Sequence, residues 1–395
     1  GKPVAAFKLG RSDAAAELAQ SHTGSLAGAD EIAEVFLQAC GIARVGSFEG
    51  LLEVAPLLAQ VPPAPQPRRG RVGVITTTGG GAAMAVDQLA LRGVDIVPAQ
   101  PATRARLTAL GIAPGDNRIL DLTLAGTRYD VMRAAIEVCR TAPEFDMVLV
   151  CVGSSARFNP DLAVQPALDL IKTPGHPFGV FLVPDAPDAA RRLACAGVPA
   201  FEDPETCADV IAAAFQRRIP HLPVPQNPPS GPATQMLDEA QAYARLATLP
   251  VADWVALDAT APVPDLPFEY PVVAKVLDAA IAHKSDVGGV VVGINSPAAL
   301  AQAMQQIRQD VAHHMADRSV TQILVQRMCK GVGEVLIGMR RDPEIGPVVV
   351  LAGGGIFTEI YRDTVMRLAP IDLQGAEEMV EALRLTQILK GARGR

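Results

Sequence analysis

The sequence is poor in aromatic residues and has no excess of positive charge. Phe, Trp and Tyr make up 4% of its 395 residues, although hydrophobic residues make up 49%. Cores built mainly from small and aliphatic side chains favour helices that pack closely on parallel strands. The 42 acidic residues outnumber the 35 lysines and arginines and give a net charge of −7. This balance argues against a nucleic-acid partner, which requires cations to neutralise phosphates.

Paired cysteines and long apolar runs are also missing. The six cysteines follow no CxxC or metal-ligand spacing, so we interpret them as free thiols in a reducing cytoplasm. No run reaches the roughly 18 apolar residues that a membrane-spanning helix needs, and we expect no membrane partner. The chain opens at Gly1, just ahead of a predicted strand, and closes at Arg395 without an obvious terminus. We therefore expect it to be a piece of a longer polypeptide.

Proline-rich stretches divide the sequence at residues 61–67 and 219–232. Such stretches form little regular structure and are typical of linkers between domains. The predicted divisions are three blocks and a linker: residues 1–61, 70–218, 219–234 (the linker) and 235–395.

The middle block alternates buried-strand and helix signals. Short apolar runs at residues 72–76, 147–152 and 179–183 read as strands, and helical patterns such as residues 129–140 and 204–217 lie between or after them. This alternation predicts an α/β fold with a doubly wound parallel sheet. The last block has more antiparallel character and predicts an α+β fold.

The first candidate for chemistry is His22, with Ser21 and Thr23 on either side in a loop rich in Gly, Ser and Thr. Such a loop offers backbone amides and hydroxyls to a phosphoryl group. A neutral imidazole is also a competent nucleophile. The alternative is a histidine that only hydrogen-bonds its loop.

The second candidate is the run Gly79, Gly80 and Gly81, between a buried strand and an apolar helix. Bare amides at a helix N-terminus attract an anion. The run lacks the lysine of a nucleotide P-loop and does not follow GxGxxG. A tight turn within an α/β domain is the alternative.

The last block holds the remaining candidates. Lys275 on a predicted strand, followed by His283 in a polar loop, suits a phosphate-binding flap, with an ordinary surface loop as the alternative. The other residues could together clamp a purine nucleotide and its metal, although each is unremarkable alone. They are Gln326, Met328, Glu334, Gly353, Gly354, Gly355 and Arg367.

Four groups of residues in this order resemble the NDP-forming (ADP-forming) acyl-CoA synthetase superfamily, typified by ADP-forming acetyl-CoA synthetase and succinyl-CoA synthetase. The resemblance covers nearly the whole chain. The strings that carry it are residues 8–12 with 21–24, residues 275–289, residues 341–343 with 353–357, and residues 367–370.

The resemblance implies a domain for each block. Residues 1–61 would be the C-terminal part of a first succinyl-CoA-ligase-like domain, with His22 as the phosphorylated histidine. Residues 70–218 would be a second, flavodoxin-like ligase domain, whose helix at Gly79–Gly81 steadies the phosphohistidine. Residues 235–395 would be an incomplete ATP-grasp domain.

Within that last domain the resemblance implies individual roles. Lys275 would bind nucleotide phosphate, Gln326 and Met328 the adenine, and Glu334 the ribose. His283 would be a second catalytic histidine that relays the phosphoryl group to ADP. Ser21, Thr23, the glycines of both runs and Arg367 would bind phosphate, and the metal ligands remain unassigned.

The implied activity is that of an acid–thiol ligase. Acyl-CoA, ADP and phosphate would give carboxylic acid, CoA and ATP through acyl phosphate and phosphohistidine intermediates. ATP/ADP, Mg²⁺ and coenzyme A are the cofactors and substrates expected. We also expect a homo-oligomer or a multidomain chain.

The sequence departs from the family pattern in three respects. The CoA-binding domain and most of the first ligase domain do not occur in it, and the acidic metal ligand would fall after Arg395. Residues 276–280 also differ from the usual string around Lys275. We therefore expect this piece alone to lack full synthetase activity.

Two other functions remain open. The chain could be the synthetase-like portion of a protein lysine acetyltransferase, although such proteins typically lack the carrier histidine that His22 supplies. It could instead be a non-catalytic acyl-CoA or nucleotide sensor, which would not need to retain Lys275 and both histidines.

Overall fold

The computed structural model describes residues 2–12, 14–15, 30–115, 117–221, 235–246, 248–354 and 363–391. The chain forms two compact units. Unit 1 consists of Gly1–Pro225 and Val335–Arg395, and unit 2 of Gln226–Glu334.

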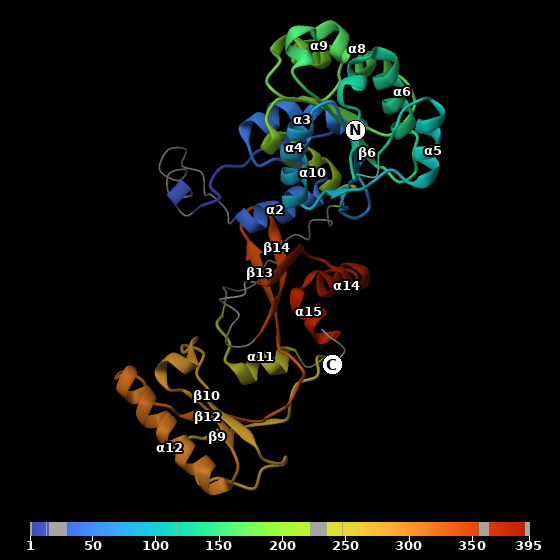
Figure 1. The fold of residues 1–395 in the computed structure, drawn as a ribbon. Helices are drawn as coiled ribbons and strands as arrows, with labels where there is room; N and C mark the ends of the chain where they lie inside the picture. The colour runs from blue at the N-terminus through green and yellow to red at the C-terminus, as the bar shows by residue number, and fades with distance from the viewer. Residues whose placement is uncertain are drawn as a thin grey trace. The chain divides into compact units, whose positions relative to one another are not determined.

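Unit 1 is built on a parallel sheet of six strands in the order β4-β3-β6-β7-β8, with β5 also paired to β3. Figure 1 labels one of these strands, β6, among the helices of the unit. β4 pairs with the start of β3 and β5 with its end, while β6 takes the opposite edge of β3. This is the 2-1-3-4-5 strand order of flavodoxin-like folds, and it confirms the predicted fold class. The strands are β3 (Arg71–Thr76), β4 (Asp95–Ile96), β5 (Leu120–Asp121), β6 (Met147–Val152), β7 (Phe178–Leu182) and β8 (Ala200–Phe201).

Helices cover both faces of this sheet because its strands are apolar on both sides. Val74, Leu149 and Phe181 belong to one buried cluster, whereas Ile75, Val150 and Val180 belong to another. On the first face lie α3 (Phe48–Gln60), α4 (Gly79–Leu91) and α10 (Pro204–Gln216). On the second lie α5 (Pro101–Ala109), α6 (Tyr129–Arg140), α7 (Ser155–Phe158), α8 (Pro160–Leu170) and α9 (Pro187–Cys195), with the turn η1 (Thr123–Thr127) nearby.

The remaining parts of unit 1 come from the two ends of the chain. Near the N-terminus, β1 (Ala5–Ala6) and β2 (Ala43–Arg44) pair in parallel, and α2 (Asp30–Ala39) precedes β2. Near the C-terminus, an antiparallel sheet is followed by two helices. These elements are β13 (Val335–Asp342), β14 (Gly346–Gly353), β15 (Thr364–Leu368), α14 (Leu373–Ala382) and α15 (Arg384–Leu389).

Unit 2 has an antiparallel sheet of four strands in the order β11-β10-β12-β9. Its long helix begins after Ser296, whose side chain accepts a hydrogen bond from the Ala299 amide, the cap expected of Ser before Pro. The apolar stripe of that helix is buried against the sheet. The elements are α11 (Glu239–Arg245), β9 (Trp254–Asp258), β10 (Val272–Val276), η2 (Lys284–Val287), β11 (Val290–Ile294), α12 (Pro297–His314) and β12 (Gln322–Arg327).

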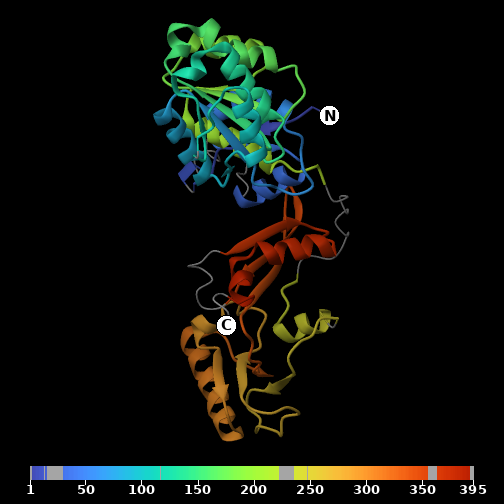
Figure 2. The same cartoon turned by 45° about the vertical axis from the view of Figure 1, so that its right-hand side comes forward.

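The two helices of unit 2 lie on different sides of its sheet. Figure 2 shows α12, in orange, along one face, and the short yellow-green α11 away from it. Figure 1 shows the same separation. α11 therefore lies on the side of the sheet opposite α12.

Among the described residues, no helix is both long and apolar enough to cross a bilayer.

Candidate functional site

The central strand β10 presents different residues to its two faces. Val272, Ala274 and Val276 are buried in the core shared with α12. Because side chains alternate along a strand, Lys275 points to the opposite face. The predicted phosphate-binding lysine thus lies on the sheet face that α12 leaves uncovered.

Gln326 on β12 lies beside Lys275 on that face. Lys275 is opposite Leu324 in the antiparallel register, and Gln326 is opposite Val273, so the two side chains are diagonal neighbours. The Lys275 Nζ donates to Gln326 Oε1 at 3.1 Å. Gln326 is 8% exposed. Two residues that the sequence assigned separately to the nucleotide site are therefore in contact.

Helix α11 adds two residues that were not predicted. Its start is fixed by a capping box between Asp238 and Gln241. Glu239 Oε1 accepts hydrogen bonds from Lys275 Nζ at 2.6 Å and from the Tyr243 hydroxyl at 2.7 Å. Gln326 Nε2 in turn donates to the Tyr243 hydroxyl at 3.2 Å. One polar network thus joins α11 to β10 and β12.

The network shifts the pKa values of Glu239 and Tyr243. Burial raises the pKa of Glu239, but the hydrogen bonds from Lys275 and Tyr243 and the charges of Lys275 and Lys284 outweigh it, and the pKa is lowered overall. Burial first, and then the hydrogen bond to Glu239, raise the pKa of Tyr243 to about 12. At neutral pH the carboxylate is ionised and the phenol is not.

The predicted flap follows β10 and returns toward the network. His283 is exposed and precedes the turn η2, which Lys284 begins. Lys284 Nζ lies 3.3 Å from Glu239 Oε2. Gly288 ends the turn at φ 67°, and a Cβ there would lie 2.6 Å from the Cβ of Asp310, so only glycine fits. This turn sets His283 one residue from a lysine of the network.

Met328 and Glu334 follow β12. The Met328 amide donates to the Pro271 carbonyl at 3.0 Å. The Met328 Sδ lies 3.2 Å from the Gly293 amide nitrogen. The Met328 side chain is 39% exposed, and Glu334 is also exposed. Since the Met328 amide is engaged, an adenine at this position would contact the side chain or the carbonyl group.

In unit 1, the run Gly79–Gly81 begins α4 at the carboxyl end of β3. The next strand at this edge is β6, and the chain reverses its winding direction between the two. Ligands of flavodoxin-like folds bind at this switch point. The Gly153 amide after β6 donates to Thr77 Oγ1 at 3.0 Å, which ties the two loops together. Gly79 and Gly80 are exposed there, so their amides are accessible to an anion.

The same edge carries residues that the sequence did not single out. Thr123, just after β5, has φ 48°, the one positive φ among the described non-glycine residues. Its amide donates to Asp121 Oδ1 at 2.9 Å. A Cβ on Gly79 would lie 3.8 Å from Asp121 Oδ2. Strained backbone of this kind often occurs beside functional sites, but only a structure reveals it.

Gly353, Gly354 and Arg367 belong to the C-terminal part of unit 1. Gly353 ends β14, and its amide donates to the Asp363 carbonyl at 2.9 Å. Arg367 on β15 is opposite Val349 of β14. Burial and the nearby charge of Arg218 lower the pKa of Arg367, although Glu378 opposes the shift.

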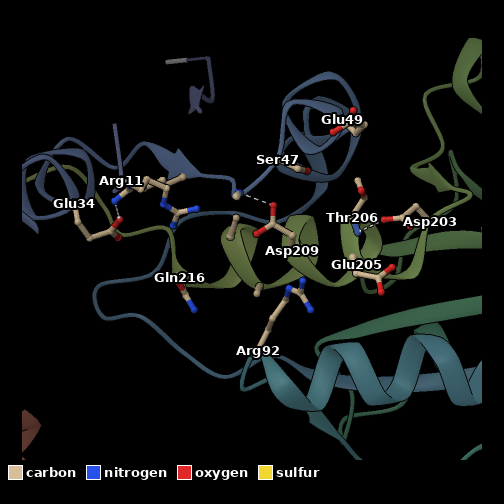
Figure 3. A pocket seen from close by; sticks show the side chains of 14 residues that line it. Arg11, Glu34, Ser47, Glu49, Arg92, Asp203, Glu205, Thr206, Asp209 and Gln216 are labelled. Carbon is tan, nitrogen blue, oxygen red and sulfur yellow. Dashed lines mark hydrogen bonds and ion pairs between the residues drawn. The ribbon is translucent and has the colours of Figure 1, made fainter. Parts of the chain in front are cut away.

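A cavity of 820 Å³ in unit 1 lies between the loop after β2, the helix α10 and Arg92 (Figure 3). The Gly46 amide donates to Asp209 Oδ2 at 2.6 Å across it. Carboxylates outnumber guanidinium groups among the described lining residues, and none of the described residues predicted to bind phosphate or nucleotide is among them. The charged lining residues are Arg11, Glu34, Arg44, Glu49, Arg92, Asp203, Glu205 and Asp209.

The described residues therefore bring Lys275 into contact with Gln326 and place the three glycines together at α4. Ser21, His22, Thr23 and Gly355 lie outside the described residues. Glu239 carried a weak sequence signal, an acidic residue in the first turn of a helix, which also fits an ordinary helix start.

Comparison with known proteins covers both units. A family model described as an ATP-grasp domain matches residues 233–395. A second, described as a succinyl-CoA ligase like flavodoxin domain, matches residues 1–58.

Curated relatives are similar along the whole chain. Acetate–CoA ligase (ADP-forming) I of Archaeoglobus fulgidus is 27% identical over 422 residues, covering 100% of this chain and 59% of the relative. The 4-hydroxybutyrate–CoA ligase (ADP-forming) of Nitrosopumilus maritimus is 24% identical over 415 residues, again 100% and 59%. The chain thus spans 59% of the length of these two relatives.

Shorter matches are more similar. The beta subunit of acetate–CoA ligase (ADP-forming) I of Pyrococcus furiosus is 40% identical over 125 residues, covering 32% of this chain and 54% of the subunit. A solved acetyl-coenzyme A synthetase 1 of Candidatus Korarchaeum cryptofilum, in complex with coenzyme A, is 32% identical and covers 40% of this chain and 70% of that one, with a TM-score of 0.35. From the two family models and these sequence relatives, the chain belongs to the ADP-forming acyl-CoA synthetase superfamily.

Proposed function

We propose that this chain carries the phosphoryl-transfer parts of an acid–thiol ligase that converts acyl-CoA, ADP and phosphate into carboxylic acid, CoA and ATP. The contact between Lys275 and Gln326 carries the proposal, because it gathers two residues assigned to nucleotide binding on one face of the sheet. The names of the relatives, which are ADP-forming CoA ligases, agree with this reaction.

The proposal assigns a domain to each block of the sequence. Residues 1–61 supply the end of a ligase domain and the carrier histidine, and residues 70–218 a second, flavodoxin-like ligase domain. Residues 235–395 supply the ATP-grasp domain, and residues 219–234 link the last two. The family-model matches to residues 1–58 and 233–395 support the outer assignments.

The chemistry divides one difficult displacement into three steps. Phosphate attacks the thioester carbonyl and expels CoA as a thiolate, which leaves an acyl phosphate. The imidazole of His22 then attacks that phosphorus, the phosphorus–oxygen bond to the acyl group breaks, and the carboxylate departs. The third step, transfer to ADP, runs through His283. Its imidazole takes the phosphoryl group from His22, a β-phosphate oxygen of ADP then attacks the phosphorus on His283, and ATP leaves with both imidazoles neutral.

Residues of the chain have separate roles in these steps. The exposed amides at Gly79 and Gly80, at the positive end of α4, stabilise an anionic phosphoryl group. The ammonium group of Lys275 offsets negative charge on the nucleotide phosphates. His283, exposed beside Lys284, relays the phosphoryl group between His22 and ADP.

Mg²⁺ supplies charge neutralisation at the phosphates of such a nucleotide when it is bound. In the part of the chain that the structure describes, no group of three or more His, Cys, Asp or Glu side chains could hold a metal ion. None of the described residues is therefore assigned to the metal.

The test is phosphorylation of the protein with γ-labelled ATP and Mg²⁺. We expect an acid-labile, base-stable label on His22 in the wild-type protein, because only a nitrogen nucleophile gives a bond of that stability. In His22→Ala the label left should be on His283 alone, since His283 receives the phosphoryl group first when ATP is the donor. His313→Ala, which removes an exposed histidine of α12, is the matched control and should retain the label.

The other functions give different results in the same assay. A protein without label in the wild type would support the sensor. A label retained in His22→Ala at any residue other than His283 would contradict the assignment of the carrier. In His283→Ala, we expect labelling from ATP to slow by at least about tenfold if His283 relays the phosphoryl group.

A further inference from the structure

Glu239 holds two lysines with one carboxylate. Its Oε1 lies 2.6 Å from Lys275 Nζ, and its Oε2 lies 3.3 Å from Lys284 Nζ. The Tyr243 hydroxyl donates to Oε1 as well, at 2.7 Å. The carboxylate therefore bridges the strand β10 and the turn η2, and a phenol fixes its orientation.

This arrangement is more than a surface ion pair. The side chains of Glu239, Lys275 and Lys284 are 18%, 21% and 22% exposed. Charges that are largely removed from water interact more strongly and are screened less by salt than exposed pairs. The lowered pKa of Glu239 agrees with a carboxylate that stays ionised between two cations.

The charges of the three groups do not balance. Two ammonium groups surround one carboxylate, so the cluster keeps one positive charge. Each ammonium group has three donors, and Lys275 uses one on Glu239 and one on Gln326. The cluster therefore attracts a further anion, and a phosphate with several oxygens could satisfy both lysines as the carboxylate does.

The helix that supplies Glu239 is lightly held. α11 has seven residues, and none of them is buried. It contacts the sheet through this network and through a ring contact between Tyr243 and Trp254, with centroids 5.6 Å apart. Glu239 can thus leave the lysines without disrupting the core of unit 2.

We propose that Glu239 occupies the anion position of the nucleotide site and keeps Lys275 and Lys284 converged until a nucleotide phosphate replaces its carboxylate. The inference rests on the proposed function, because it assigns this site to a nucleotide, and it adds Glu239 and Lys284 to that site. Glu239 is a positioning residue, and Lys284 becomes a second phosphate-binding lysine.

While the Glu239 carboxylate occupies the anion position, the site cannot bind the phosphates of ADP. The apparent affinity for ADP is therefore reduced in proportion to the fraction of molecules in which Glu239 has left that position. Glu239→Gln keeps the shape and the acceptor for Tyr243 but removes the charge. We expect ADP to bind this variant about three- to tenfold more tightly than the wild-type chain. Adenosine, which has no phosphate, should bind both equally.

The experiment is calorimetric titration of the full chain with ADP and with adenosine. Lys284→Met tests the second lysine and should weaken ADP binding several-fold with adenosine unchanged. Asp317→Asn is the control for general loss of negative charge, since Asp317 is an exposed acid in the turn after α12, which packs on the other face of the sheet. It should bind ADP as the wild type does.

The possible results separate the two proposals. If the wild type binds ADP and Glu239→Gln binds it equally or more weakly, Glu239 does not compete with the nucleotide phosphate. That result overturns the inference and leaves the proposed function in place. Unchanged binding by Lys284→Met removes Lys284 from the site. If no form of the chain binds ADP, both the inference and the nucleotide function are wrong.

Discussion

At the residue scale, two of the three glycines that begin α4, Gly80 and Gly81, differ in the space around them. A Cβ on Gly80 would meet no atom within 4 Å, whereas a Cβ on Gly81 would lie 2.1 Å from Cγ1 of Val183. Val183 follows β7 and is β-branched, so it has few alternative rotamers. Gly81 is therefore required by packing, and Gly80 is available for a ligand.

We predict that Gly81→Ala lowers the free energy of unfolding by about 1–3 kcal/mol, because the added methyl group overpacks the contact with Val183. Gly80→Ala, the matched control, should be neutral or stabilising by up to about 1 kcal/mol, because Ala favours helix. Urea denaturation of both variants measures the difference. Equal stabilities would contradict the packing role of Gly81.

Site residues could be predicted singly but not as a network. Lys275 on a strand before a glycine-containing loop, and Gln326 at the end of another, were visible as patterns. Glu239 was not, because its partner Lys275 is 36 positions away. A carboxylate in the first turn of a helix has the same local signal whether it stabilises the helix N-terminus or pairs with a lysine of a neighbouring strand.

At the element scale, carboxylates crowd where α3 meets the segment between β8 and α10. Glu53 on α3 is partly buried there. Burial first, and then the negative charges of Glu202, Asp203 and Glu49, raise its pKa from 4.5 to about 7. The packing of these elements thus creates a group that takes up a proton near neutral pH.

The sign of the pH effect follows from this raised pKa. Between pH 4.5 and about 7 the folded state binds more protons at Glu53 than the unfolded state does. The contribution of Glu53 to stability is therefore fully present below the lower pH and is lost as the pH rises through the window.

We predict that Glu53→Gln, which mimics the protonated side chain, stabilises the protein by about 1–3 kcal/mol at pH 8 and has little effect at pH 4.5. Thermal or urea unfolding at the two pH values measures this difference. Glu31→Gln, at an exposed position of α2, serves as the control and should show no such dependence. If Glu53→Gln and the wild type have the same free energy of unfolding at pH 8, the ionised Glu53 side chain does not destabilise the folded protein.

At the scale of the whole molecule, each unit has its own hydrophobic core. The core of unit 2 joins the sheet to α12 and includes Leu300 and Ile307, both 0% exposed. In unit 1, residues from the C-terminal part contact the earlier part, as in the ion pair of Arg218 with Glu378 at 3.6 Å. Separate cores predict separate unfolding transitions.

We predict that residues 235–334, expressed alone, fold and unfold cooperatively, because every buried residue of their core comes from that segment. Far-ultraviolet circular dichroism during heating measures the transition. Ile307→Ala should lower its midpoint markedly, since such a core truncation costs about 2–5 kcal/mol. A broad transition that Ile307→Ala leaves unaltered would show that the segment has no packed core by itself.

The sequence alone determined the elements and the class of the fold. Apolar runs such as residues 147–152 are buried on both faces, and the stripe on residues 297–314 is buried on one, because local periodicity reflects how much of each element faces the core. Motifs with a local spacing, such as Gly79–Gly81 and the string from Lys275 to Gly289, were equally readable.

Only the tertiary structure decided which chemical groups meet. Thr77 and the Gly153 amide are 76 positions apart, and Tyr243 and Gln326 are 83 apart, yet both pairs are hydrogen-bonded. Strand order and register bring such groups together, and no local pattern encodes that order. The sequence predicted Lys275 as a phosphate ligand, and the fold added the carboxylate of Glu239 that holds it.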